Sequence, residues 1–100
     1  MTVKAFANSC RALARAENEC ICQLTELTFK PQPSWEEINK AFQLTIELRR
    51  IHLDAMEGFA LCSGIVPVQT VSSLLNHSAL TLTEALLILD RLARNYHSRS

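Results

Sequence analysis

The chain has 100 residues, of which 48% are hydrophobic and 6% aromatic, and its ten basic residues balance ten acidic residues. This length fits one domain with a modest core, and the hydrophobic content excludes a disordered chain. The net charge of zero excludes an overall basic surface for nucleic acid or an anionic membrane, and two glycines and three prolines are too few for a sandwich or barrel, so we expect an all-α fold.

A first helix is predicted for residues 2–29. Apolar residues recur there at alternating steps of three and four, which is the spacing of one helix face. They are Val3, Phe6, Cys10, Leu13, Cys20, Leu24 and Leu27. Glu17 falls where the pattern misses one apolar residue. Either it lies in the apolar stripe, where the helix bends or meets a basic partner, or the stripe drifts and Glu17 is solvated; the pattern favours the second interpretation.

The cysteines are expected to stay reduced, because the chain has no secretory signal pattern and a cytoplasmic location follows. Cys20 and Cys22 are two residues apart, so on a helix they point about 200° from each other and cannot bind one ion. Cys10 and Cys20 fall on the apolar stripe, while Cys22 points away from it. We therefore expect no metal site and no cofactor.

A second helix is predicted for residues 34–63. Pro31 and Pro33 end the first helix, and Ser34 with Glu37 forms a capping box that begins the next one. Gly64 is placed for a left-handed C-cap. The connection is short, so the two helices are expected to form an antiparallel hairpin.

This second helix has two apolar stripes, so it needs to be covered on two sides. The first helix covers one side, and the C-terminal third or a second subunit covers the other. One stripe comprises Ala41, Leu44, Leu48, Ile51, Ala55, Gly58 and Cys62. The other comprises Trp35, Ile38, Phe42, Ile46, Leu53, Met56 and Phe59.

The C-terminal third is predicted to contain a short helix at 68–76, a turn at 77–80 and a helix at 82–96. A second capping box, from Thr81 to Glu84, would open the last helix. Its inward face comprises Leu82, Ala85, Leu89, Leu92 and Tyr96, and the apolar run Leu86-Leu87-Ile88 widens that face. The result is a bundle-like single domain over residues 1–97 with a frayed tail at 98–100.

No catalytic residues are predicted, and an enzyme is not expected. The three histidines lie in three separate segments, with no serine, cysteine or carboxylate at a spacing typical of a triad. His52 is expected to be solvated or partly stacked. No run of 18 apolar residues is long enough to span a bilayer, so no membrane association is expected.

The remaining interpretation is a protein–protein interaction module, because the apolar surface exceeds what a small helical monomer buries. We expect an adaptor, a chaperone-like protein or a regulator that acts as a homodimer or bound to another helical chain. The partner-binding residues would be Ile46, Leu53, Met56, Phe59, Leu86, Leu87 and Ile88. Leu87 and Ile88 are the residues most strongly expected at the interface.

The alternative is a helix-turn-helix regulator that binds DNA through residues 68–96, with Arg91 and Arg94 on the phosphates. Residues near the start of its recognition helix disfavour this alternative. Glu84 would repel phosphate, and Leu87 and Ile88 have no hydrogen-bond donors for bases.

Overall fold

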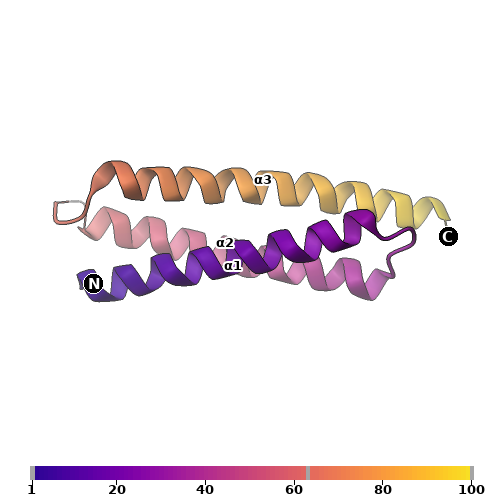
Figure 1. Ribbon diagram of the computed structural model, residues 1–100, viewed down its shortest axis with the longest axis horizontal. Coiled ribbons are helices and arrows are strands. Elements are labelled where there is room, and N and C mark those ends of the chain that lie inside the picture. Colours follow the sequence, from indigo (N-terminus) through magenta and orange to yellow (C-terminus); the bar gives the residue numbers. More distant parts are fainter. Residues whose placement is uncertain (1, 63, 100) are drawn as a thin grey trace.

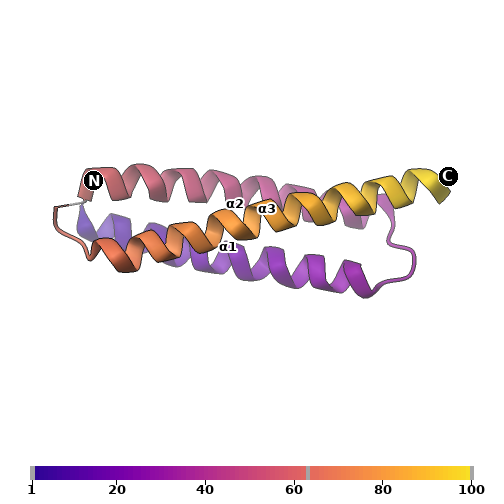
Figure 2. The same cartoon turned by 90° about the horizontal axis from the view of Figure 1, so that it is seen from above.

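The computed structural model describes residues 2–62 and 64–99, which form three long helices, each antiparallel to the one before it in the chain (Figure 1). They are α1 (Val3–Phe29), α2 (Trp35–Cys62) and α3 (Val68–Arg99). The bundle measures 53 × 19 × 17 Å, and the two termini lie at opposite ends (Figure 2). The all-α, bundle-like fold predicted from the sequence is therefore confirmed, as is the hairpin of the first two helices.

Local signals in the sequence define where α1 begins and how it connects to α2. Thr2 caps α1 through its hydroxyl, which accepts from the backbone N–H of Ala5 at 3.1 Å. The predicted box at Ser34 forms in both directions: the Glu37 N–H donates to Ser34 Oγ at 3.1 Å, and the Ser34 N–H donates to Glu37 Oε1 at 3.0 Å. Lys30 also binds Glu37, and these donors lower the pKa of Glu37 to about 2.

The second connection differs from the expectation at Gly64. Neither glycine has a positive φ, so the predicted left-handed cap is wrong. Instead, the N–H groups of Ile65 and Val66 both donate to the carbonyl oxygen of Cys62, at 2.9 and 3.2 Å. These two bonds use the last carbonyl of α2 without a left-handed residue. The predicted end of this helix at Ser63 lies outside the described residues.

The predicted turn at 77–80 is also wrong, because α3 is one continuous helix of 32 residues. The Thr81 hydroxyl does not cap a helix; it donates to the carbonyl oxygen of His77 one turn earlier, at 3.1 Å. Ser78 and Thr81 are buried against the other helices. Packing on that face favours helix across a segment whose polar residues alone suggest a turn, and no Gly or Pro interrupts it.

Two clusters of buried side chains form the core. The larger contains Leu13, Cys20, Leu24, Leu27, Ile38, Ala41, Leu48, Ala55, Ala85 and Leu89. The smaller lies where α2 ends and contains Phe6, Cys62 and Val71. The face of α2 toward this core, which we call the inner seam, comprises Ile38, Ala41, Thr45, Leu48, His52, Ala55, Gly58 and Cys62. Small side chains predominate in the inner seam.

Aromatic side chains join α2 and α3 at the opposite end of the bundle. Trp35 packs against Tyr96 and His97, with ring centroids 5.3 and 5.4 Å apart. Arg99 donates to the carbonyl oxygen of Pro33 at 2.7 Å, so α3 extends beyond the predicted end at residue 96. Ser100, the last residue of the predicted tail, lies outside the described residues.

Residue 79 offers a direct test of the continuous α3. Replacing exposed Ala79 with glycine in a helix interior is expected to lower the free energy of unfolding by about 1 kcal/mol. Ala14→Gly on the exposed face of α1 is the matched control and should cost a similar amount. Urea denaturation of both variants measures the difference. A cost near zero for Ala79→Gly alone would show that the helix is interrupted there.

Candidate functional site

Polar side chains from all three helices meet in the middle of the bundle, and we call this group the central polar layer. It comprises Glu17, His52, His77 and Ser78. Glu17 is only 5% exposed, so the expectation that it is solvated is wrong. Its Oε2 lies 2.8 Å from Nδ1 of His77, while its buried Oε1 has no hydrogen-bond partner within the described residues. The Glu17 carboxylate is therefore held at a position of the α1 apolar stripe.

His52 is likewise buried, which corrects the expectation of a solvated histidine. Its Nδ1 lies 2.5 Å from Oγ of Ser78. The Ser78 hydroxyl donates to the carbonyl oxygen of Leu75 at 3.0 Å, and it can accept from Nδ1 of His52 in the tautomer that carries a proton on that nitrogen. Burial lowers the pKa of His52, and the charge of Glu17 opposes that effect.

The pair of Ser78 and His52 does not have the arrangement of a nucleophile and its base. A catalytic histidine accepts the serine proton, whereas the Ser78 hydroxyl donates to the carbonyl oxygen of Leu75 here. Ser78 is also fully buried, so a substrate has no access to its oxygen. The central polar layer is a structural element of the bundle.

The second feature is an exposed face of α2, which we call the outer seam. Its residues alternate at steps of four and three, the spacing of the contact positions in a coiled coil. Its five large apolar side chains are each between 42% and 46% exposed. The full set is Trp35, Asn39, Phe42, Ile46, Arg49, Leu53, Met56 and Ala60. This helix therefore has one heptad-like seam inside the bundle and another on its surface.

The outer seam borders a groove between α2 and α3, the α2–α3 groove, which consists of two adjoining hollows. One encloses about 380 Å³ and is lined by apolar residues together with Asn39 and Asp90. The other encloses about 230 Å³ and contains Arg49, with Ile46 and Leu53 on one wall and Leu82 on the other. Phe42 and Leu86 line both hollows. The groove is thus predominantly apolar, with one charged residue on each side of its centre.

The predicted partner-binding residues divide into three groups. Ile46, Leu53 and Leu86 line the α2–α3 groove, and Met56 continues the outer seam. Phe59 and Ile88 are partly buried and pack against the two core clusters. Leu87 is 63% exposed and lies one heptad from Leu80, on the side of α3 away from the core. The structure therefore separates Leu87 from Ile88, which were expected together at the interface.

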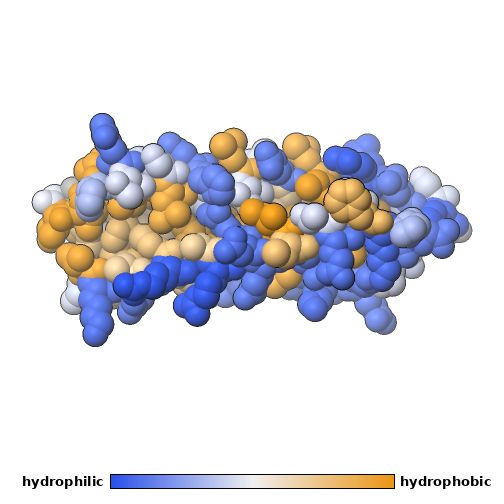
Figure 3. All heavy atoms as spheres, in the orientation of Figure 1, coloured by the Kyte–Doolittle hydropathy of each residue, from blue (hydrophilic) through white to orange (hydrophobic). Residues whose placement is uncertain are grey.

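Apolar side chains are also exposed outside the groove. Figure 3 shows the face formed by α1 and α3, on which hydrophobic side chains gather at the end where both helices begin and again over the other half. The exposed apolar residues near that end of the bundle, on the three helices and the second connection, are Val3, Leu61, Ile65 and Val68. These surfaces lack the regular spacing of the outer seam, so the α2–α3 groove is the better candidate site.

The residues of the DNA-binding alternative lie on an uninterrupted helix. Because α3 has no turn, the helix-turn-helix geometry does not form. Arg94 binds Asp90 of its own helix at 3.0 Å, and Arg91 lines a separate hollow beside Phe29 and Lys30. Neither arginine is positioned by a recognition helix.

Comparisons with protein-family models, with curated proteins and with solved structures found no match to the chain. None of the helices in residues 2–62 and 64–99 is long and apolar enough to cross a membrane. The geometry of the described residues is therefore the basis on which a function is proposed.

Sequence reasoning missed the central polar layer and the exact division of α2 into two seams. A signal for the first was present, because Glu17 interrupts an apolar stripe at a position that otherwise faces the core. The inner seam shares most of its residues with the first predicted stripe and takes Ile38 from the second; the shared residues are Ala41, Leu48, Ala55, Gly58 and Cys62. Its polar members, Thr45 and His52, are not distinguishable from surface residues by hydropathy alone.

The buried His52 predicts that stability depends on pH. Its pKa in the folded protein is below the ordinary value of about 6.5, so the unfolded chain binds a proton first as the pH falls. The free energy of unfolding should therefore decrease as the pH falls below about 6.5. His52→Asn keeps a polar atom near Ser78 but cannot titrate, so its decrease should be smaller.

Urea titrations of both proteins between about pH 7.5 and pH 5.5 compare the two slopes, since Glu and Asp titrate mainly below that range. Equal slopes for the two proteins would contradict a buried, neutral His52.

Proposed function

We propose that the chain is a small helical protein–protein interaction module that receives an apolar helix face in its α2–α3 groove. It acts as an adaptor, chaperone-like protein or regulator in the cytoplasm, as a homodimer or bound to another helical chain. The observation on which the proposal depends is the outer seam, because a helix on the surface of a monomer needs one apolar face only.

The sizes of the side chains in the two seams support this proposal. Five of the eight inner-seam residues are small, and only Ile38, Leu48 and His52 are large, whereas all five large apolar residues of the outer seam remain exposed; these are Trp35, Phe42, Ile46, Leu53 and Met56. A monomer selected only for its own stability would bury the larger apolar side chains, since each contributes about 1.5–3 kcal/mol when fully buried. The distribution in α2 is instead typical of a helix that packs against neighbours on two sides.

The form of the groove indicates the kind of partner. Two antiparallel helices with an apolar groove between them can bind an amphipathic helix, as in other helix-in-groove complexes. Trp35 lines one hollow of the groove and Leu53 lines the other. Phe42 and Leu86 lie where the two hollows join. A fourth helix in this position would complete a four-helix arrangement with α1, α2 and α3.

Paired substitutions test the proposed surface. Ile46→Gln with Leu86→Gln makes the centre of the groove polar, and we expect it to abolish the native complex of the chain in an extract of cells that produce it. Leu80→Gln with Leu87→Gln is the matched control, because these leucines are similarly exposed but lie outside the groove. Native mass determination after affinity capture measures both results.

Each substitution removes a side chain that is about half exposed, so the fold itself should lose about 1 kcal/mol or less per residue. The control variant is expected to keep the complex. A complex that survives the groove substitutions and is lost in the control would instead assign binding to the outer side of α3. A chain that is captured alone in every form would contradict the proposed function.

A further inference from the structure

The α2–α3 groove is self-complementary, and we infer that its partner is a second copy of this chain, related by a twofold axis that passes between Phe42 and Leu86. This inference rests on the proposed function and specifies the partner. Phe42 and Leu86 belong to both hollows, so they mark the centre of the groove. A twofold axis at the centre places the first hollow of one copy against the second hollow of the other, and the two copies then lie antiparallel.

The charges at the groove fit this symmetry. Asp90 lies in one hollow and Arg49 in the other, so they are on opposite sides of the shared residues. The twofold axis brings Arg49 of each copy to Asp90 of the other copy, which gives two equivalent ion pairs. Charge complementarity of this kind fixes register and excludes partners with like charges at those positions.

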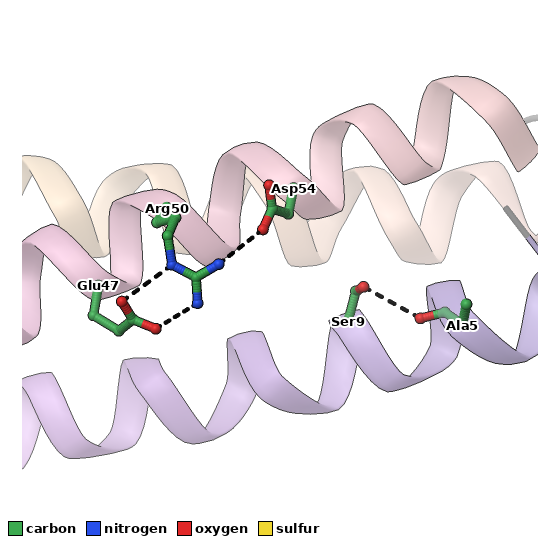
Figure 4. Close-up of polar contacts among 5 residues, drawn as sticks. All are labelled: Ala5, Ser9, Glu47, Arg50 and Asp54. Carbon is green, nitrogen blue, oxygen red and sulfur yellow. Dashed lines mark hydrogen bonds and ion pairs between the residues drawn. The ribbon is translucent and has the colours of Figure 1, made fainter.

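Arg49 is available for such a pair. Arg49 is exposed in the hollow that it shares with Ile46 and Leu53, and within residues 2–62 and 64–99 it forms no hydrogen bond or ion pair. The adjacent Arg50 differs: it lies between Glu47 and Asp54 on the solvent side of α2 and binds both (Figure 4). Asp90 is 58% exposed, so it can bind a second cation in addition to Arg94.

The outer seam also contains the polar interruptions expected of an interface with one register. Asn39 and Arg49 occupy contact positions among apolar residues. In coiled coils, a polar residue at such a position reduces stability but selects one register and one oligomeric state. The net charge of zero removes the overall repulsion that would oppose association of two copies.

The exposed area agrees with one missing neighbour. A compact protein of 11.2 kDa exposes about 5,700 Å², whereas this chain exposes 6607 Å². The difference of about 900 Å² is close to the roughly 800 Å² that each partner buries in a stable interface. Two bundles side by side along the groove would remove this excess.

Charge reversal tests the arrangement on the purified full chain. We expect the average mass from sedimentation equilibrium to rise from near that of the monomer towards twice that mass between about 1 and about 100 µM, with a dissociation constant in this range. Arg49→Glu and Asp90→Lys each place like charges together twice in the dimer, so each should raise the dissociation constant about tenfold or more. An equimolar mixture of these two variants restores both ion pairs in a heterodimer, and the dimer mass should return.

Arg15→Glu and Glu26→Lys make the same charge changes on exposed positions of α1, away from the groove, and should leave the dimer unchanged. A chain that is monomeric up to about 100 µM would overturn the inference. The proposed function would still stand if the chain forms a groove-dependent complex in the extract. A dissociation constant that is unchanged in both charge-reversal variants would overturn the twofold arrangement at Phe42 and Leu86. So would a mixture of the two variants that stays monomeric.

Discussion

The small inner seam of α2 is the constraint on which the rest of the structure depends. Ala41, Ala55 and Thr45 from α2 lie against the core, and Ser78 and Ala85 of α3 are similarly small and buried. Small side chains let helices approach closely, so the bundle is narrow in proportion to its length. A narrow bundle cannot bury every large apolar residue, which is why Trp35, Phe42 and Ile46 remain half exposed on the outer seam.

The central polar layer defines how the three helices align within this narrow bundle. A buried carboxylate is costly unless it is paired, and Glu17 pairs with His77 through one oxygen only. Such groups therefore contribute little net stability, but their hydrogen bonds form in only one alignment of the helices. A shift of α1 by one heptad would separate Glu17 from His77, and the same shift of α3 would also separate Ser78 from His52. Apolar residues alone would specify the alignment less strictly.

These two features together connect the fold to the proposed interaction. The polar layer fixes the register of α2 against α3, and this register determines that Arg49 and Asp90 lie on opposite sides of Phe42 and Leu86. The self-complementary groove is thus a consequence of internal alignment rather than of local sequence. Many large apolar side chains are exposed, as the sequence indicates, but the places where they are exposed depend on how the helices pack.

The sequence by itself determined α1, α2 and the connection between them. Apolar spacing predicts α1 and α2 closely, and the box at Ser34 forms as expected because its hydrogen bonds involve residues three apart. Tertiary structure decided the continuity of α3, the burial of Glu17 and His52, and the separation of Leu87 from Ile88. Each of these features depends on contacts between residues that are distant in the chain. The free energy of these contacts exceeds the small local helix preferences on which the sequence pattern depends.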